Sequence, residues 1–433
     1  MRIFGLFLIA VSLLVPLVWT LEMAGVHPKA ALFSQYLGVL ALLSMSIAQI
    51  LAARLPGAEF LFGGLDRIYV LHKWLAVFAM VCLGLHEIID AEIDGLGPET
   101  GLMDIAEDVG EIALYGLLIL VFVTVTTFIP YQYWRWSHQF IGLFFAMGVF
   151  HYVFVQKPYG QLDPPSLYVL FFCAAGLLSY LYMVLLYVRF PGPRRYRVVN
   201  CLAFGDATEI VMAPESKRIR HKPGQFAFFE FDLPGMTEIH PFTIAGGPQE
   251  NGELRICVKG LGTYTDDLIK TVKPDVAVNV FGSFGHFRMP SDDRPQIWIA
   301  AGIGITPFMS WARSLKASEV KSPIHLYYCI RSEDDAPFID ELRAIAQANP
   351  TFKLSLHNSV RDGRLVTERI ADANAELKNT FVGFCGPTAM RNELRSGLVA
   401  KGLKKSRFHF EEFEIRTSVG LLSIAEWVLK RFR

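Results

Sequence analysis

Two long apolar stretches of the sequence each contain two histidines. His72 and His86 lie fourteen positions apart in "LHKWLAVFAMVCLGLHEII", and His138 and His151 lie thirteen positions apart in "SHQFIGLFFAMGVFHYVFV". An imidazole is costly to place in hydrocarbon, so each ring is expected to have a binding partner there. Pairs of neutral imidazoles that face each other across a helix bundle suit the axial ligation of haem iron. The four histidines are therefore candidate metal ligands.

Three other uses of buried histidines compete with this interpretation: hydrogen bonds between helices, a proton relay and a zinc site. The imidazoles lie at two matched depths, about 20 Å apart along each helix. Two haems explain this arrangement better than these three uses do. A spacing of thirteen turns a straight helix about 140° away from the same face, so we expect the second stretch either to be distorted or to approach the two haems from different sides. Gly142 and Gly148 lie between its histidines and would permit this. Phe144 and Phe145 lie between those glycines and could fill the gap between two macrocycles.

The helices that carry these histidines belong to a hydrophobic first half of the chain. Of the 433 residues, 52% are hydrophobic, the mean hydropathy is +0.34 and the formal net charge is +0. The hydropathy is too high for an ordinary soluble enzyme, and the balanced charge gives no support to a nucleic-acid partner. The six cysteines form no C-x-x-C pair, so neither a thiolate iron–sulfur cluster nor a zinc ribbon is expected.

Six apolar runs precede Arg189, and each is long enough to cross a membrane. We therefore expect residues 1–192 to form an all-α membrane bundle of six helices. The first run is interpreted as an anchor and not as a signal peptide, because no A-x-A-like cleavage site follows it. The expected spans are 3–21, 30–53, 69–90, 111–129, 136–156 and 165–189.

The basic residues predict how this bundle is oriented. With the N-terminus inside, the outer loops hold only Lys29 and Lys157, and the segment from Asp90 to Glu111 contains many carboxylates but no Lys or Arg. The inner side is expected to hold most of the Lys and Arg residues. The soluble half is thus expected in the cytoplasm and the chain in the plasma (inner) membrane. The inner basic residues are Arg54, Arg67, Lys73, Arg135, Arg189, Arg194, Arg195 and Arg197.

Short strands and helices alternate in the second half. Over residues 193–292, strand-like runs punctuated by glycine and proline predict a small antiparallel β-barrel. Over residues 293–415, buried strands and helical runs predict an α/β doubly wound domain with a parallel sheet. Gly302 and Gly304 follow its first strand, where a tight turn lets the backbone approach a dinucleotide, although a purely structural turn explains them equally well. Residues 416–433 predict an amphipathic tail, either on the membrane surface or covering the reductase domain.

Six short motifs of the second half resemble those of the ferredoxin-NADP reductase superfamily. Joined to six apolar helices with two histidine pairs, they make the chain similar to the NADPH oxidase and ferric reductase family over about residues 30–415. This resemblance implies FAD, two b-type haems and NADPH (or NADH) as cofactors. The motifs are "KPGQF", "HPFT", "KGLGTYT", "GSFG", "GIGITP" and "CGP".

The resemblance also implies roles for individual residues. His72 and His138 would ligate an inner haem, and His86 and His151 an outer one. Cys385, close to the nicotinamide, and Phe413, stacked on the flavin, would be the catalytic residues. The residues implied for FAD are His240, Pro241, Phe242, Thr243, Lys259, Gly262 and Thr265, and those for the dinucleotide are Gly302, Gly304, Thr306, Pro307, Gly386 and Pro387.

The expected function is that of an NAD(P)H-dependent transmembrane oxidoreductase. Electrons from cytoplasmic NAD(P)H would pass through FAD and both haems to an acceptor on the opposite face, either oxygen, giving superoxide, or a ferric or cupric complex. The acidic segment that begins at Asp90 mildly favours the metal complex. The alternative is an electron-transfer subunit that serves an extracytoplasmic protein. Arg331 could bind a 2′-phosphate, but the carboxylates after it leave the choice between NADPH and NADH open.

Overall fold

The computed structural model divides the chain into a helical unit and a reductase unit, with the boundary in the sequence after residue 191. It describes residues 3–55, 57–89, 100–125, 131–187, 192–215, 217–236, 238–315, 322–334, 336–374 and 376–411. Asp90, Arg189, Phe413 and the tail 416–433 lie outside the described residues.

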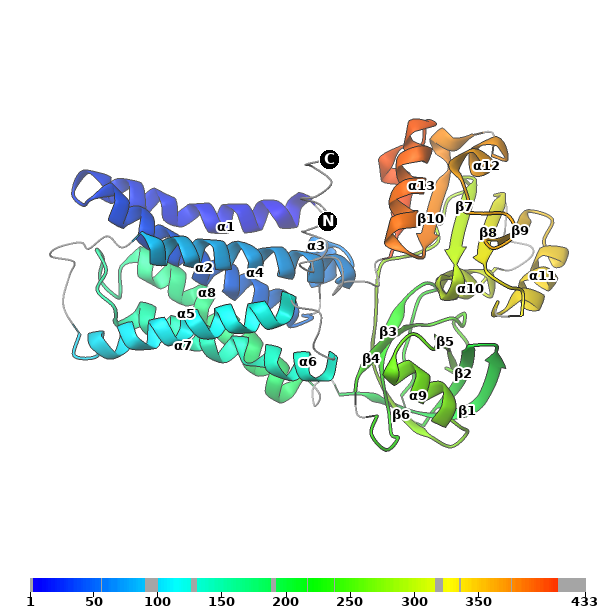
Figure 1. Cartoon of the computed structure of the whole chain (residues 1–433), viewed down its shortest axis with the longest axis horizontal. Coiled ribbons are helices and arrows are strands. Elements are labelled where there is room, and N and C mark those ends of the chain that lie inside the picture. The colour runs from blue at the N-terminus through cyan, green and yellow to red at the C-terminus, as the bar shows by residue number, and fades with distance from the viewer. Residues whose placement is uncertain are drawn as a thin grey trace. The chain divides into compact units, whose positions relative to one another are not determined.

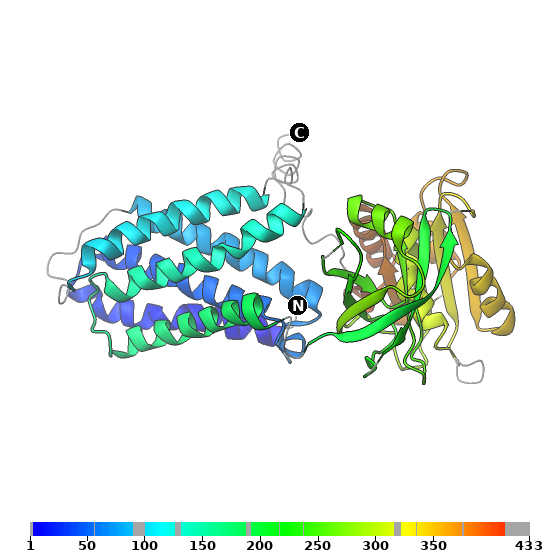
Figure 2. The same cartoon turned by 90° about the horizontal axis from the view of Figure 1, so that it is seen from below.

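The helical unit consists of helices that run roughly parallel to one another (Figures 1 and 2). The second of them, α2, is the central one, because 67% of its apolar window is buried, against 17–28% for the other four apolar helices. It packs against α4 and α8, while α5 packs against α7. The elements are α1 (Ile3–Glu22), η1 (Met23–Gly25), α2 (Lys29–Ala52), α3 (Ala58–Phe62), α4 (Leu65–Ile88), α5 (Met103–Val125), α6 (Tyr131–Gln139), α7 (Ile141–Phe154), α8 (Pro164–Leu181) and the π-helical turn η2 (Tyr182–Leu186).

Five helical segments among the described residues are long and apolar enough to cross a membrane: Ile3–Gly25, Lys29–Ala52, Arg67–Ile88, Trp136–Phe154 and Pro164–Leu186. Large apolar side chains such as Phe4, Phe122 and Phe171 are 60–69% exposed on this unit, a surface that suits lipid and not water. The chain is therefore a membrane protein. α5 is not among the five, and its first turns contain acidic residues, Asp104, Glu107, Asp108 and Glu111.

The stretch expected to span residues 136–156 is not one straight helix. It begins within α6, and the helix is interrupted at Phe140 before α7 begins at Ile141. The expected distortion between His138 and His151 is thus confirmed. It falls two residues before Gly142 and not at either glycine.

The first half of the reductase unit is a six-stranded antiparallel sheet in the order β4-β3-β6-β1-β2-β5. A bridge between Ile244 and Ile256 brings the two edge strands together, so the sheet curls into a half-barrel. Alternating side chains such as Tyr196, Phe229 and Ile256 fill its interior and are fully buried. The elements are β1 (Arg194–Phe204), β2 (Ala207–Pro214), β3 (Phe226–Phe231), β4 (His240–Thr243), β5 (Leu254–Lys259), α9 (Thr263–Thr271) and β6 (Ala277–Phe284).

The second half is a parallel sheet in the order β11-β10-β7-β8-β9. One apolar cluster that includes Trp298 and Trp311 covers one face, and a second that includes Ile299 and Leu398 covers the other, as expected for a doubly wound domain. The elements are β7 (Gln296–Ala301), η3 (Gly302–Ile305), α10 (Thr306–Ala312), β8 (Ile324–Ile330), α11 (Ile339–Ala348), β9 (Phe352–Asn358), α12 (Thr367–Asp372), η4 (Leu377–Asn379), β10 (Phe381–Cys385), α13 (Thr388–Ala400), η5 (Lys405–Arg407) and β11 (Phe408–Phe410).

Candidate electron-transfer and nucleotide-binding sites

His72 on α4 and His138 on α6 have ring centroids 6.3 Å apart and an angle of 63° between the ring planes. A metal–imidazole bond is about 2.0 Å long, so two imidazoles that share one metal ion have ring centres about 6–7 Å apart. The pair therefore has the spacing that one iron between two axial histidines requires.

The Nδ1 atom of each of these two rings faces a hydrogen-bond acceptor on a neighbouring helix. His72 Nδ1 lies 2.9 Å from the carbonyl oxygen of Ala48. Since a carbonyl can only accept, Nδ1 carries the proton and Nε2 keeps its lone pair. His138 Nδ1 lies 3.4 Å from the hydroxyl of Thr124, which already donates its own hydrogen to the carbonyl of Leu120. This outer hydrogen bond fixes the tautomer and makes Nε2 the nitrogen available for a metal.

His86 on α4 and His151 on α7 repeat the arrangement toward the other end of the unit. His86 Nδ1 lies 2.8 Å from the carbonyl of Ser34 on α2, and His151 Nδ1 lies 2.8 Å from that of Ala106 on α5. The hydroxyl of Ser34 is a second neighbour of the His86 ring, at 2.9 Å. Both rings thus also have Nε2 as the free ligand nitrogen.

Two glycines make room for these outer rings. A Cβ atom on Gly110 would lie 2.5 Å from His151 Nδ1, so a side chain there would prevent the bond to Ala106. A Cβ atom on Gly38 would lie 3.3 Å from His86 Nε2, so this glycine leaves the ligand nitrogen of His86 unobstructed. Both glycines thus leave space beside the outer rings, as the binding of a large group between the rings requires.

The histidines come in pairs: among the described residues no three His, Cys, Asp or Glu side chains gather to hold a metal ion. Two axial nitrogens are what a haem needs from a protein, because the macrocycle supplies the remaining ligands. The spacing of His72 and His138 therefore fits a haem, and the two oriented imidazoles of His86 and His151 are the kind of ligands that a second haem requires. Phe144 and Phe145 lie between the levels and pack against glycines of the neighbouring helices, Gly116 and Gly176. Their bridging of the two haems stays a prediction.

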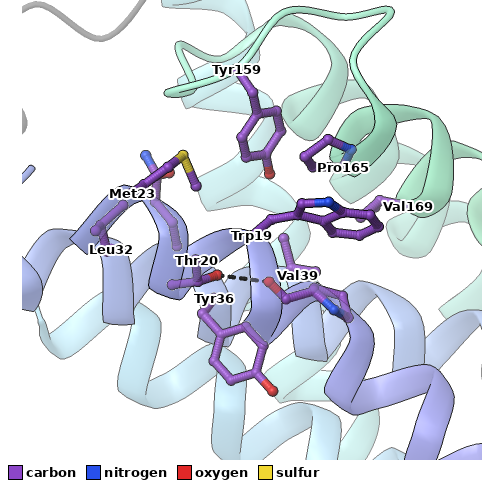
Figure 3. A pocket seen from close by; sticks show the side chains of 11 residues that line it. Trp19, Thr20, Met23, Leu32, Tyr36, Val39, Tyr159, Pro165 and Val169 are labelled. Carbon is purple, nitrogen blue, oxygen red and sulfur yellow. Dashed lines mark hydrogen bonds between the residues drawn. The ribbon is translucent and has the colours of Figure 1, made fainter. Parts of the chain in front are cut away.

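A small cavity opens between α1, α2 and α8, where Trp19, Tyr36 and Tyr159 line it (Figure 3). Its volume of about 20 Å³ has room for about one water molecule. It is too small for a haem or for an organic electron acceptor.

The expected flavin residues gather at one edge of the half-barrel. His240, Pro241, Phe242 and Thr243 form β4, and the bridge to β5 places this strand beside the turn that follows Lys259. His240 stacks on Tyr264 of α9 with ring centroids 3.7 Å apart and lies 2.7 Å from Glu238. The "HPFT" and "KGLGTYT" motifs, some twenty residues apart in the sequence, are thus adjacent in space.

The polar groups of this edge suit an anion. Lys259 Nζ is partly exposed and lies 2.8 Å from the carboxylate of Asp206. The Thr265 hydroxyl accepts from the amides of Leu261 and Gly262, at 2.9 and 3.1 Å, and so shapes the turn at the start of α9. A cation beside a helix N-terminus is a combination that binds phosphate, so the residues fit the FAD pyrophosphate.

The dinucleotide residues lie at the carboxyl edge of the parallel sheet. Gly302 and Gly304 follow β7, and Gly386 and Pro387 follow the neighbouring strand β10. A Cβ atom on Gly304 would lie 2.3 Å from the carbonyl of Cys385, so only glycine allows these two turns to touch. The sheet order reverses between β7 and β10, which is where open α/β sheets bind their ligands. Thr306 and Pro307 form the first turn of α10, and Arg331 is exposed after β8.

Cys385 is fully buried at this edge, and burial, with the nearby carboxylate of Glu411, raises the pKa of its thiol well above the ordinary value. The side chain is therefore a neutral thiol and not a thiolate nucleophile. Glu411 itself is buried, and its carboxylate lies close to Gly285 of the "GSFG" motif. Glu411 was not predicted from the sequence, although it directly follows the short strand β11.

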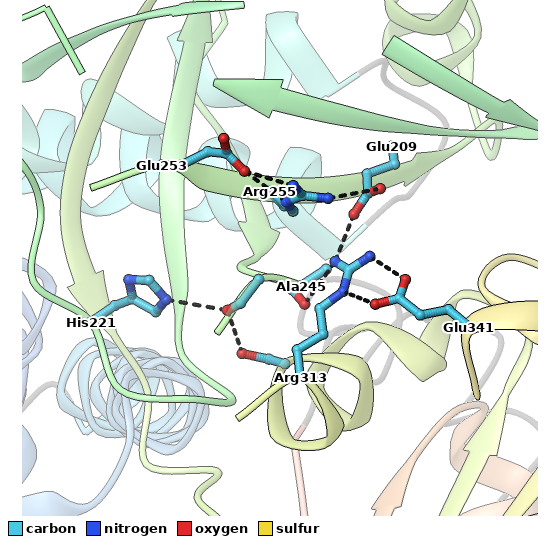
Figure 4. A network of polar contacts seen from close by, with 9 residues as sticks. Glu209, His221, Ala245, Glu253, Arg255, Arg313 and Glu341 are labelled. Carbon is cyan, nitrogen blue, oxygen red and sulfur yellow. Dashed lines mark hydrogen bonds and ion pairs between the residues drawn. The ribbon is translucent and has the colours of Figure 1, made fainter. Parts of the chain in front are cut away.

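A second set of polar residues, also not predicted from the sequence, connects the half-barrel to the parallel sheet (Figure 4). Arg313, at the end of α10, is 10% exposed and contacts Glu209 of β2 at 2.7 Å. The same guanidinium forms two bonds of 2.7 and 2.8 Å to Glu341 of α11. Glu209 is 2% exposed, so without Arg313 a buried carboxylate would keep, among the described residues, Arg255 at 3.9 Å as its cationic partner.

Comparison with known families agrees with this architecture. Residues 37–149 match the ferric reductase like transmembrane component, a match that includes three of the four histidines. Residues 195–301 match an FAD-binding domain, and residues 298–396 match an oxidoreductase NAD-binding domain.

Individual relatives match parts of the chain. An NADPH oxidoreductase of Mycobacterium tuberculosis is 27% identical over 202 residues, 45% of this chain and 53% of that protein. A superoxide-generating NADPH oxidase heavy chain of Dictyostelium discoideum is 25% identical over 287 residues, 59% of this chain and 53% of that one. The chain thus spans about half the length of these curated relatives. A flavohemoglobin structure from Malassezia yamatoensis shares the fold with a TM-score of 0.50 and 17% identity, covering 88% of this chain and 96% of that one.

The chain thus combines a membrane unit with an FAD-binding domain and an oxidoreductase NAD-binding domain. Its membrane unit matches a ferric reductase like component and a superoxide-generating NADPH oxidase is among its relatives, so the chain is similar to the NADPH oxidase and ferric reductase family.

Proposed function

We propose that this protein carries electrons from cytoplasmic NAD(P)H across the membrane to an acceptor on the opposite side, with one FAD and two b-type haems bound. The observation that carries the proposal is the arrangement of the four histidines. Each places Nδ1 against an acceptor on α2 or α5, and at each level one ring comes from α4 and the other from α6 or α7. Such outer hydrogen bonds make imidazoles more basic and orient them for iron.

His72 and His138 would hold the inner haem, and His86 and His151 the outer one. When bound, FAD accepts a hydride and releases single electrons, which the haems relay. The chain would supply the ligand nitrogens, the three carbonyls and the Thr124 hydroxyl that orient them, and an apolar surrounding that keeps water from the iron.

The reductase unit would bind the two nucleotides at neighbouring edges of its sheets. β4 and the turn after Lys259 would hold FAD, and the turns after β7 and β10 would hold the nicotinamide dinucleotide. Cys385, as a neutral thiol, would contact the nicotinamide without adding charge. Arg331 would bind the adenosine half of the dinucleotide, including its 2′-phosphate, in line with a preference for NADPH.

The proposal includes α5 as a sixth membrane span. Its 23 residues extend about 34 Å, enough to cross the hydrocarbon core. Its acidic first turn lies at the same end of the bundle as His151, whose ring bonds to Ala106. The excess of Lys and Arg in the loops at the other end supports an N-terminus and a reductase unit in the cytoplasm.

The acceptor would be oxygen or a ferric complex. The name of the Dictyostelium relative, a superoxide-generating oxidase, supports the former, and the description of the matched membrane component supports the latter.

Cofactor analysis of the purified full-length protein tests the proposal. We expect two b-type haems and one FAD per chain, and consumption of NAD(P)H that requires either oxygen or a ferric chelate. A protein that binds FAD but no haem would contradict the proposal, and NAD(P)H consumption with neither acceptor would contradict the choice of acceptors.

A further inference from the structure

We propose that Arg313, Glu209 and Ser310 form a positioning clamp that fixes helix α10 against the flavin-binding strands and thereby sets the geometry of hydride transfer from NAD(P)H to FAD. This inference deepens the proposed function and rests on it, because it takes the flavin and dinucleotide sites as placed above. The clamp lies within the reductase unit, between its half-barrel and its parallel sheet (Figure 4).

The guanidinium of Arg313 forms the first contact across this boundary. On its own side it is held by two bonds to Glu341 and lies over the ring of Phe338, with 4.9 Å between the guanidinium carbon and the ring centroid. Across the boundary, Nη1 donates to the carboxylate of Glu209 at 2.7 Å and to the carbonyl of Ala245 at 3.2 Å. A planar guanidinium held on several sides has one orientation, so it fixes the distance between the two domains.

Ser310 forms the second contact, one turn earlier on α10. Its hydroxyl donates to the carbonyl of Gly246 at 2.8 Å and accepts from the amide of Gly224 at 3.3 Å. A Cβ atom on Gly224 would lie 2.4 Å from Trp311 Nε1, so the two backbones approach as closely as the chain allows. All seven residues of α10 are buried, which leaves the helix no freedom to tilt.

The segments that the clamp joins are those that carry the candidate binding motifs. Ala245 and Gly246 follow "HPFT" closely, and Gly224 lies within "KPGQF". At the other end of α10, Thr306 and Pro307 complete "GIGITP", seven residues or about 10 Å from Arg313. The clamp is thus a short rigid connection between the flavin motifs and the dinucleotide motif.

The rate of hydride transfer depends on how precisely such a connection positions the nicotinamide relative to the flavin. The C–H bond of the nicotinamide breaks, and the hydrogen and both electrons form an N–H bond of the flavin, leaving NAD(P)⁺. The reacting atoms must approach to about 3–3.5 Å, and a misplacement of about 1 Å can cost about 100-fold in rate. A small rotation between the domains would be enough to cause this.

Three single substitutions in the full-length holoprotein test the clamp. Arg313→Lys keeps the positive charge but removes the planar guanidinium with its several hydrogen-bond donors. Glu209→Gln keeps the shape of the side chain but removes its negative charge. Glu341→Gln is the matched control. It weakens a bond to the same guanidinium, but this bond lies within the parallel-sheet domain and does not cross the boundary. We expect the rate constant of anaerobic flavin reduction by saturating NAD(P)H to fall at least about 10-fold in the first two variants and less than about twofold in the control.

Two further measurements separate positioning from loss of structure. FAD content and the Kd of NAD(P)H should change less than about twofold in all three variants, because the substituted residues lie outside both binding motifs. Hydrogen–deuterium exchange of the amides of residues 306–315 should become faster in Arg313→Lys and Glu209→Gln only, with or without nucleotide. Should Arg313→Lys fail to retain FAD, Ser310→Ala replaces it in the comparison, with the same expected pattern.

Flavin reduction at the wild-type rate in both boundary variants, or equal exchange of residues 306–315 in all proteins, would overturn the clamp. A higher Kd for NAD(P)H with an unchanged rate at saturation would also overturn it, since binding and not positioning would then be affected. If the wild-type flavin is not reduced by NAD(P)H at all, the proposed function fails, and the exchange experiment still decides the clamp by itself.

Discussion

His72 and His138 are separated by 66 positions in the sequence, yet their ring centroids lie 6.3 Å apart, on α4 and α6. Neither ring is placed by its own helix alone. The carbonyl of Ala48 on α2 orients one, and the hydroxyl of Thr124 on α5 orients the other. The pair is therefore a product of four helices, which is how a buried site acquires a fixed geometry.

Replacement of His72 by leucine should remove one haem and leave the other. The apolar substitute fills the space without offering a nitrogen, so the pyridine haemochrome assay should give one haem per chain in place of two. Reduction of FAD by NAD(P)H should persist, and reduction of the acceptor should fall at least about 100-fold, since one relay position is lost. Retention of two haems would remove His72 from the ligand set.

Gly110→Ala should weaken haem binding at the outer level. The added Cβ atom would lie 2.5 Å from His151 Nδ1 and force the ring away from Ala106. Loss of such an outer-sphere bond typically costs about 10–100-fold in metal affinity. Haem titration of the purified variant measures this. Gly84→Ala is the control, because nothing lies within 4 Å of a Cβ atom at that position, and equal haem content in the two variants would contradict the assignment.

Lys259→Ala should weaken FAD binding about 10- to 100-fold, the effect expected when a hydrogen bond to a charged group worth about 1.5–3 kcal/mol is lost. Haem content should stay the same. Fluorescence titration of deflavinated protein with FAD gives the Kd. The exposed Lys273 of the same domain serves as the control, in a Lys273→Ala variant. An unchanged Kd for Lys259→Ala would place the pyrophosphate elsewhere.

The reductase unit should lose stability as the pH falls from about 6.5 to 4. Burial first, and then the neighbouring charge of Lys353, lowers the pKa of His325 to about 4, so the unfolded chain takes up a proton that the folded one does not. The contribution of His325 to the free energy of unfolding is fully present above its ordinary pKa of 6.5. It decreases by about 1–3 kcal/mol as the pH falls through this window. Hydrogen exchange of β8 and β9 in the full-length protein should show this, and His325→Gln should flatten the profile. An identical profile for the variant would assign the acid sensitivity to other groups.

Several elements could be predicted because each depends on a local pattern. The long apolar runs and the alternation of strands and turns depend on burial over a few residues, and the structure places helices and strands there. The position of the helix break at Phe140 depends on tertiary packing and was not predictable from Gly142 and Gly148. Arg313 and Glu209 are 104 positions apart, and charged residues without a motif give no indication of a partner so distant.

The direction of electron flow is the central claim, and proteoliposomes test it most directly. Full-length protein is reconstituted with a membrane-impermeant ferric chelate or cytochrome c trapped inside, and NAD(P)H is added outside. For the molecules whose reductase unit faces outward, we expect reduction of the trapped acceptor, abolished in His86→Leu and His151→Leu. Reduction only when the acceptor and NAD(P)H share the same compartment would contradict the account.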